Sequence, residues 1–225
     1  MDNVIATRST VSNIDTLLKT LASIVDAGVT NNDIRILSVS LADSSMAGVM
    51  TPSNKIELSP VAAKRIFDYV LENIKYVPDI DGIETFQTPE VTLLNKFGDC
   101  DDMTSLLGAM YRAIGFTYAL VTVQLPGFTD YNHVYGAVYT TEGWKYVDAS
   151  DKDTGSFDNA PDNGDIAKRK VMIIGNAEPG DTFFKDGKTE ISYYNGPGSN
   201  MIPSLMPLIL LGIAAGIIYY IDKRR

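Results

Sequence analysis

Apolar residues recur every three or four positions in three parts of the first 115 residues. This spacing predicts a helix over residues 12–27, a second helix that starts at Pro60 after the N-cap residue Ser59, and a third over residues 99–114. Residues 34–41 alternate apolar with polar or small side chains, and a period of two predicts a strand.

The pattern changes to a period of two after Gly115. It predicts strands over residues 118–125, 131–140, 144–148 and 171–175, with a weak hairpin over residues 183–194. A group of helices followed by adjacent strands predicts an α+β fold, in which the third helix packs on an antiparallel sheet.

A different pattern begins at Ile202 and ends at Ile221, a stretch of 20 residues without a charge. At 1.5 Å per residue such a helix is long enough to cross a hydrocarbon core of about 30 Å. Two tyrosines near its end and a basic tail after it are typical of a membrane boundary. We therefore expect a single-pass C-terminal transmembrane helix, with the lipid bilayer as a partner. A buried C-terminal core helix is the alternative, but such a helix usually has one polar face and this stretch has none.

Five segments result from these patterns. They are an N-terminal helix and strand accessory segment (1–55), a main α+β domain (56–195), a linker (196–201), the transmembrane helix (202–221) and a basic tail (222–225). The side of the membrane stays open, because the basic tail favours an internal C-terminus while the N-terminus shows no export signal. An assembly that builds its own membrane, such as a membrane-containing virion, would resolve this conflict.

Charge narrows the classes of partner. The net charge is −9, which argues against a nucleic-acid-binding protein, because that class needs a basic surface. The Asp-rich residues 151–165 lack the spacing of an EF-hand loop, so we predict no metal site there. We expect no cofactor.

The chain contains one cysteine, Cys100, and one histidine, His133. Asp148 follows them in the run Trp-Lys-Tyr-Val-Asp. A thiol needs a base to become a nucleophile, and the base needs an acid to orient it, so the order Cys, His, Asp suits nucleophilic catalysis. Each residue taken alone is more often structural, since single cysteines are commonly buried as small apolar groups. Asp99, Asp101 and Asp102 flank the thiol, and their charges oppose thiolate formation unless they point away or bind backbone amides.

Strand geometry predicts whether the side chains of His133 and Asp148 lie on the same face of the sheet. If the strands that carry His133 and Asp148 form a hairpin with an even loop, Tyr135 lies opposite Asp148 and His133 is its diagonal neighbour on the same face. An odd loop would place the two side chains on opposite faces and separate them.

Three separated motifs resemble the transglutaminase-like superfamily of cysteine enzymes. They are Gly-Asp-Cys-Asp-Asp at residues 98–102 with the apolar helix after it, His-Val-Tyr at 133–135, and Gly-Trp-Lys-Tyr-Val-Asp at 143–148. Two upstream segments, 74–79 and 87–93, are similar to the lead-in of that family. The resemblance covers about residues 60–150.

The resemblance implies a papain-like arrangement with Cys100 as nucleophile, His133 as general base and then acid, and Asp148 as the residue that orients it. The backbone amide of Cys100 and one further donor would stabilise the oxyanion. Gln87 is a candidate for that donor, although a polar loop residue is its simpler interpretation. The chemistry implied is acyl transfer from an amide of a peptide or protein substrate through a thioester, with water or an amine as acceptor.

Two functions remain open from the sequence. The first is a membrane-anchored protease, amidase, cell-wall peptide hydrolase or cross-linking enzyme. The second is a non-enzymatic structural membrane protein of a virion or similar assembly, which uses the fold as a scaffold and contacts shell proteins.

Overall fold

A computed structural model gives the structure of this chain. It describes residues 6–7, 13–42, 49–50, 56–57, 59–80, 85–150, 157–159, 166, 168–175 and 188–196. All structural statements below concern these residues.

The described part of the chain contains helices α1 (Ile14–Val29), α2 (Asn32–Ala42), α3 (Pro60–Asn73), α4 (Pro89–Asn95) and α5 (Cys100–Ala113). The predicted starts of the first two long helices are close to the observed ones, because capping groups set them. The side chain of Asn13 accepts from the Thr16 amide at α1, and that of Ser59 accepts from the Ala62 amide ahead of Pro60 at α3.

Residues 34–41 are helical, so the predicted strand there is wrong. Asn31, which resembles a turn residue in the sequence, caps α2 by accepting from the amides of Asp33 and Ile34. The buried positions of α2 are Ile34, Ser38 and Ala42, four residues apart. A polar residue in the middle of this stripe hides the helical period, and the Ser38 hydroxyl is satisfied by donating 2.7 Å to the Ile34 carbonyl.

The main sheet has five strands in the order β11-β10-β7-β8-β9. Their bounds are β7 (Thr117–Gln124), β8 (His133–Thr140), β9 (Gly143–Val147), β10 (Lys168–Ile174) and β11 (Thr189–Tyr194). Three of the four pairings are antiparallel, as predicted, but β10 and β11 pair in parallel. The α+β prediction is therefore confirmed, with a parallel edge pair that the sequence did not predict.

Six two-residue strands complete the described elements. They pair as β1 (Ala6–Thr7) with β5 (Thr85–Phe86), β2 (Val49–Met50) with β3 (Ile56–Glu57), and β4 (Lys75–Tyr76) with β6 (Phe97–Gly98). The parallel β4–β6 pair lies directly before α5 and contributes to the site described below.

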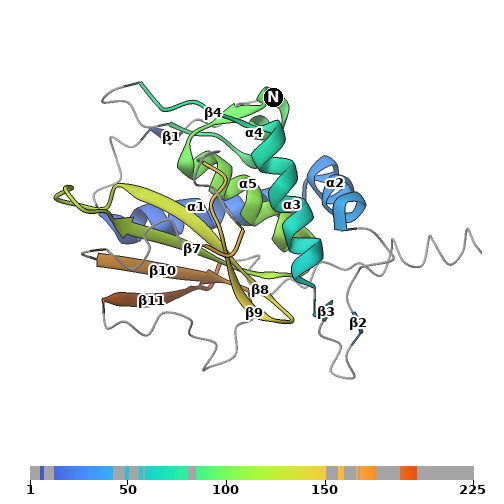
Figure 1. Ribbon diagram of the computed structural model, residues 1–225. Coiled ribbons are helices and arrows are strands. Elements are labelled where there is room, and N and C mark those ends of the chain that lie inside the picture. The colour runs from blue at the N-terminus through green and yellow to red at the C-terminus, as the bar shows by residue number, and fades with distance from the viewer. Residues whose placement is uncertain are drawn as a thin grey trace, which may run out of the picture.

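The helices gather on one side of the sheet, with α5 between α3 and the strands (Figure 1). Side chains of α1, α2, α3 and α5 form one hydrophobic core with the helix-facing residues of β7 and β8. The opposite face of these strands packs into a second cluster around Val121 and Tyr135. The predicted boundary at residue 55 does not coincide with a break in this core, because α1 and α2 share it with α5.

None of the helices in the described ranges is both long enough and apolar enough to cross a membrane. The predicted transmembrane helix, residues 202–221, lies outside the described residues, as do most of the predicted linker and the basic tail.

Candidate active site

The predicted nucleophile is the first residue of α5. Cys100 is half-buried and follows the N-cap residue Asp99. Met103, Leu107 and Met110, which follow Cys100 at helical spacing, are all buried in the core, and Cys100 packs against it. The thiol therefore lies at the positive end of the helix dipole.

The β8–β9 hairpin brings the predicted base and acid together. Thr140 pairs with Gly143, so the loop has two residues, and the observed register continues to place Tyr135 opposite Asp148. Gly143 has a φ of 91°, which glycine adopts without strain at this tight turn. The predicted even loop is confirmed, and His133 Nε2 lies 2.7 Å from Asp148 Oδ2.

Ser150 fixes the orientation of Asp148 through the second carboxylate oxygen. Its Oδ1 accepts from the Ser150 amide at 3.0 Å and from the Ser150 hydroxyl at 2.6 Å. Because Asp148 engages Nε2, the other ring nitrogen of His133, Nδ1, is the one that can exchange a proton with the thiol. The ring also stacks on Tyr135, at 6.1 Å between centroids.

The thiol reaches β8 next to the histidine. The backbone amide of Val134, the residue after His133, is a hydrogen-bond donor to the sulfur and favours its thiolate form. Thr104, one turn further along α5, donates 3.3 Å to the Val134 carbonyl. The first turns of α5 are thus attached to the strand that carries the base.

Electrostatics keep the resting thiol protonated. Burial, followed by the charges of Asp101 and Asp99, raises the pKa of Cys100 well above its usual value, and the Val134 amide offsets only part of this rise. Burial also acts to raise the pKa of Asp148, but its hydrogen bonds to His133 and Ser150 and the charge of His133 hold it below its usual value. The structure therefore contains a thiol that needs a base and a carboxylate that stays ionised.

The side chain of Gln87 already has hydrogen-bond partners in the structure. Its Nε2 donates to Asp102 Oδ2 at 2.7 Å and to the Phe97 carbonyl at 3.1 Å, which uses both amide hydrogens. Its role as an oxyanion donor stays a prediction that would require these bonds to break.

Tyr76 is a residue that the sequence interpretation missed. It pairs with Gly98 in the β4–β6 pair, two residues before Cys100. Burial and the charges of Cys100, Asp99, Asp101 and Asp148 raise its pKa to about 12, so its phenol is a hydrogen-bond donor at neutral pH. The run Ile74-Lys-Tyr in the lead-in segment was the available signal.

Helix α4 has no counterpart among the helices that the sequence pattern predicts. Thr88 followed by Pro89 repeats the start signal of Ser59 and Pro60, and could have identified it.

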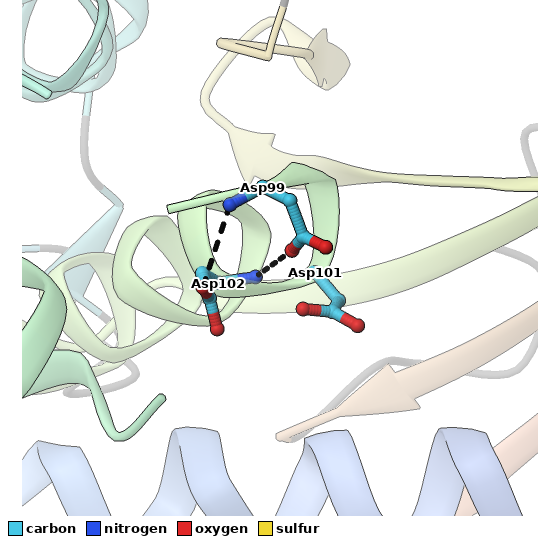
Figure 2. Close-up of side chains that lie close together, drawn as sticks. All are labelled: Asp99, Asp101 and Asp102. Atoms are coloured by element: carbon cyan, nitrogen blue, oxygen red, sulfur yellow. Dashed lines mark hydrogen bonds between the residues drawn. The ribbon is translucent and has the colours of Figure 1, made fainter. Parts of the chain in front are cut away.

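Three carboxylates at the start of α5 are close enough to hold a metal ion. The ligand atoms of Asp99, Asp101 and Asp102 lie within 4.8 Å of one another (Figure 2). Asp99 and Asp102 cap each other's backbone amides, and Asp102 also accepts from Gln87. These bonds account for the cluster as a helix cap.

A thiol at the start of a helix, attached to a strand whose histidine binds an aspartate directly after the next strand, defines a papain-like arrangement. Residues 40–149 match the model of a family described as the transglutaminase-like superfamily. The resemblance that the sequence motifs indicated is confirmed over these residues. No match was found among curated proteins.

Solved structures with a similar fold include two bacterial proteins. One is a putative protease from Parabacteroides distasonis ATCC 8503, with 15% identity, a TM-score of 0.41, and 62% of this chain and 30% of that chain covered. Another is a putative cysteine protease from Cytophaga hutchinsonii, with 16% identity, a TM-score of 0.41, and coverage of 74% and 57%.

A third similar structure is the Rad4/XPC nucleotide excision repair complex, with 12% identity, a TM-score of 0.42, and coverage of 70% of this chain and 47% of that chain. In all three cases the aligned part spans less than two thirds of the other protein's length.

Proposed function

We propose that this chain is a cysteine enzyme that transfers an acyl group from an amide of a peptide or protein substrate through a thioester on Cys100. The observation that carries this proposal is the 2.7 Å contact between His133 and Asp148, on the strand whose next amide binds the thiol. An imidazole held by an ionised carboxylate beside a helix-borne thiol is the arrangement that nucleophilic catalysis requires.

In the acylation step the Cys100 thiol gives its proton to His133 Nδ1 as the sulfur attacks the substrate carbonyl carbon. The raised pKa of the thiol means that proton transfer accompanies the attack rather than precedes it. Asp148 stabilises the imidazolium that forms. Contacts between the ring and the sulfur commonly tighten when the Michaelis complex forms.

The tetrahedral intermediate carries a negative charge on the former carbonyl oxygen. The backbone amide of Cys100, at the N-terminus of α5, supplies one donor to it. Tyr76 is our candidate for the second donor, because its phenol stays protonated close to the thiol. The intermediate then collapses, the C–N bond breaks, and the imidazolium proton passes to the leaving amine.

Deacylation repeats these steps with a new acceptor. His133 takes a proton from water or from a primary amine, the acceptor attacks the thioester carbon, and the C–S bond breaks to release the Cys100 thiolate, which recovers the proton. Water gives peptide or amide hydrolysis, including that of cell-wall peptides, and an amine gives a cross-link.

The single cysteine makes the test direct. Iodoacetamide transfers a carbamidomethyl group to Cys100 alone among thiols, so intact-protein mass spectrometry gives its alkylation rate. Because the pKa of the resting thiol is raised, we expect the folded protein to be alkylated more slowly at neutral pH than the same chain in denaturant. We also expect it to release amine from a peptide mixture, with alkylation and release both absent in Cys100→Ala. A folded protein that releases no amine, or releases it equally as Cys100→Ala, would contradict the proposal.

The raised pKa of Cys100 favours a second function. A thiol kept neutral by burial and by Asp101 and Asp99 also suits a protein that has retained the fold without turnover. Such a protein would act as a structural component between a membrane and the shell proteins of a virion or similar assembly. Under this alternative Cys100→Ala assembles normally and loses no measurable property.

Membrane attachment is part of both proposals. The uncharged stretch at residues 202–221 supports a single-pass anchor after a head formed by residues 56–195. We expect the full chain to float with liposomes in a density gradient and to resist carbonate extraction, while a chain that ends at residue 195 stays at the bottom. Equal behaviour of the two chains would contradict the anchor.

A further inference from the structure

A closed hydrogen-bond network joins the segment before α5 to the first turn of that helix. Gln87 and Asp102 are its centre. The backbone amide of Gln87 donates to Asp102 Oδ1 at 2.7 Å, and the side-chain Nε2 of Gln87 donates to Asp102 Oδ2 at 2.7 Å. Gln87 Nε2 also donates to the Phe97 carbonyl, and Asn95 Nδ2 donates 3.0 Å to Gln87 Oε1. We call this set of bonds the Gln87–Asp102 clamp.

The clamp is packed tightly against the residues that lead to the thiol. Asp102 is 3% exposed. A Cβ atom at Gly98 would lie 2.6 Å from the Asp102 Cβ, so only glycine fits there without a shift. The segment from Phe97 to Asp99 is thus held by hydrogen bonds at one end and by close packing in the middle.

The same carboxylate takes part in the helix cap. Asp102 Oδ2 accepts from the Asp99 amide at 3.4 Å, and Asp99 Oδ1 accepts from the Asp102 amide at 3.5 Å (Figure 2). This capping box uses the amides of the N-cap and third helical residues. It does not use the amide of Cys100, the first helical residue, which is the donor that an oxyanion needs.

Asp102 and Cys100 project from nearly opposite sides of the helix, because two residues correspond to about 200° of rotation. Asp102 therefore acts on the thiol through the backbone of the first turn and not by contact with the substrate. Asp102 therefore lies where it can set the orientation of the Cys100 backbone amide and sulfur.

We propose that Gln87 and Asp102 are positioning residues. They hold the first turn of α5 so that the Cys100 backbone amide and thiol are both correctly placed relative to the substrate carbonyl. This inference rests on the proposed acyl transfer at Cys100. Loss of the clamp misplaces both groups relative to His133, and a displacement of about 1 Å can lower a rate by about 100-fold.

Two near-isosteric variants test the inference. Gln87→Met removes the side-chain hydrogen bonds, and Asp102→Asn replaces one acceptor oxygen by a donor that faces other donors. We expect each to lower kcat by up to about 100-fold with KM unchanged, and to slow iodoacetamide alkylation of Cys100. The double variant should be no slower than the slower single variant, because both changes break one network.

The matched control is Asp79→Asn. Asp79 also binds a backbone amide and a hydroxyl, both of Thr85, and these hydrogen bonds do not involve α5. We expect its alkylation rate and kcat to equal those of the unchanged chain. Circular dichroism and thermal unfolding identify variants that fail to fold, and a lower Tm with unchanged kcat in the folded fraction would overturn the positioning role.

The outcomes separate the two proposals. If the unchanged chain releases no amine from a peptide mixture, the proposed function fails. If the unchanged chain is reactive and both clamp variants match it in kcat and alkylation rate, the clamp inference alone is overturned.

Discussion

At the scale of single residues, the hydrogen bond between His133 and Asp148 gives the most direct prediction. Asp148→Asn preserves the shape of the side chain but removes the charge that orients and stabilises the imidazolium. By analogy with serine-protease triads, we expect kcat to fall by up to about 10⁴-fold, measured as amine release from a peptide substrate.

A control beside the same hairpin, at a carboxylate that binds Lys145 of β9, distinguishes this effect from general destabilisation. Asp158 binds Lys145 at 2.8 Å and is exposed, so Asp158→Asn removes a carboxylate near β9 without touching the histidine. We expect it to retain full activity. A loss as large as that of Asp148→Asn would contradict the assigned role.

Tyr76→Phe tests the second oxyanion donor. Removing the hydroxyl should lower kcat by about 100-fold and leave KM unchanged, because the bond is made to the charge that develops in the transition state. Tyr139→Phe, a half-exposed tyrosine on β8, is the matched control and should behave as the unchanged chain. Steady-state kinetics that show a change in KM alone would assign Tyr76 to substrate binding instead.

The sequence could predict some of these residues and not others for a physical reason. Cys100 and His133 are unique in the chain, and strand parity alone links His133 to Asp148. Tyr76 comes close to the thiol through the pairing of two-residue strands that lie more than 20 positions apart. No local sequence pattern predicts that pairing.

At the scale of elements, the long amphipathic helices and the alternating strands were predictable because their period is set by the core that they face. Helix α2 was not, since a serine occupies its buried stripe and Ile36 is 62% exposed. The parallel pairing of β10 and β11 depends on the path between them, which periodicity does not encode.

The packing contact between α5 and β8, which we call the seam, can be tested by substituting Gly136. A Cβ at Gly136 would lie 1.9 Å from the Tyr118 hydroxyl, which donates 3.0 Å to the Thr104 carbonyl in α5. Gly136→Ala should therefore push Tyr118 away, separate α5 from the strand, and cost about 1–3 kcal/mol in the free energy of unfolding.

Tyr118→Phe in the same background removes the atom of closest approach. We expect the double variant to recover part of the lost stability in urea unfolding experiments. An equal loss in the single and double variants would show that the strain lies elsewhere in the seam.

At the scale of the whole molecule, the buried Asp102 links folding to pH. Burial raises its pKa from 3.8 to about 6, so the folded state binds a proton that the unfolded state has already lost between these values. Its contribution to stability is present below about pH 4 and is lost as the pH rises through 6. The difference amounts to about 3 kcal/mol.

Urea unfolding at several pH values, compared with Asp102→Asn, isolates this contribution. The unchanged chain should lose stability relative to the variant as the pH rises from 4 to 6. The contribution of Asp148 to stability depends on pH in the opposite direction, because its pKa is lowered and the contribution is lost as the pH falls. A pH-independent difference between the two proteins would show that Asp102 does not titrate in this window.

One consequence of the hairpin concerns how the site would fail. His133 and Asp148 lie 15 positions apart on a single two-residue turn, whereas Cys100 belongs to a different layer. Partial opening of the molecule between the layers would leave the acid–base couple assembled and remove only its nucleophile. Inactivation by heat or denaturant would then precede loss of secondary structure, and would reverse as soon as the layers dock again.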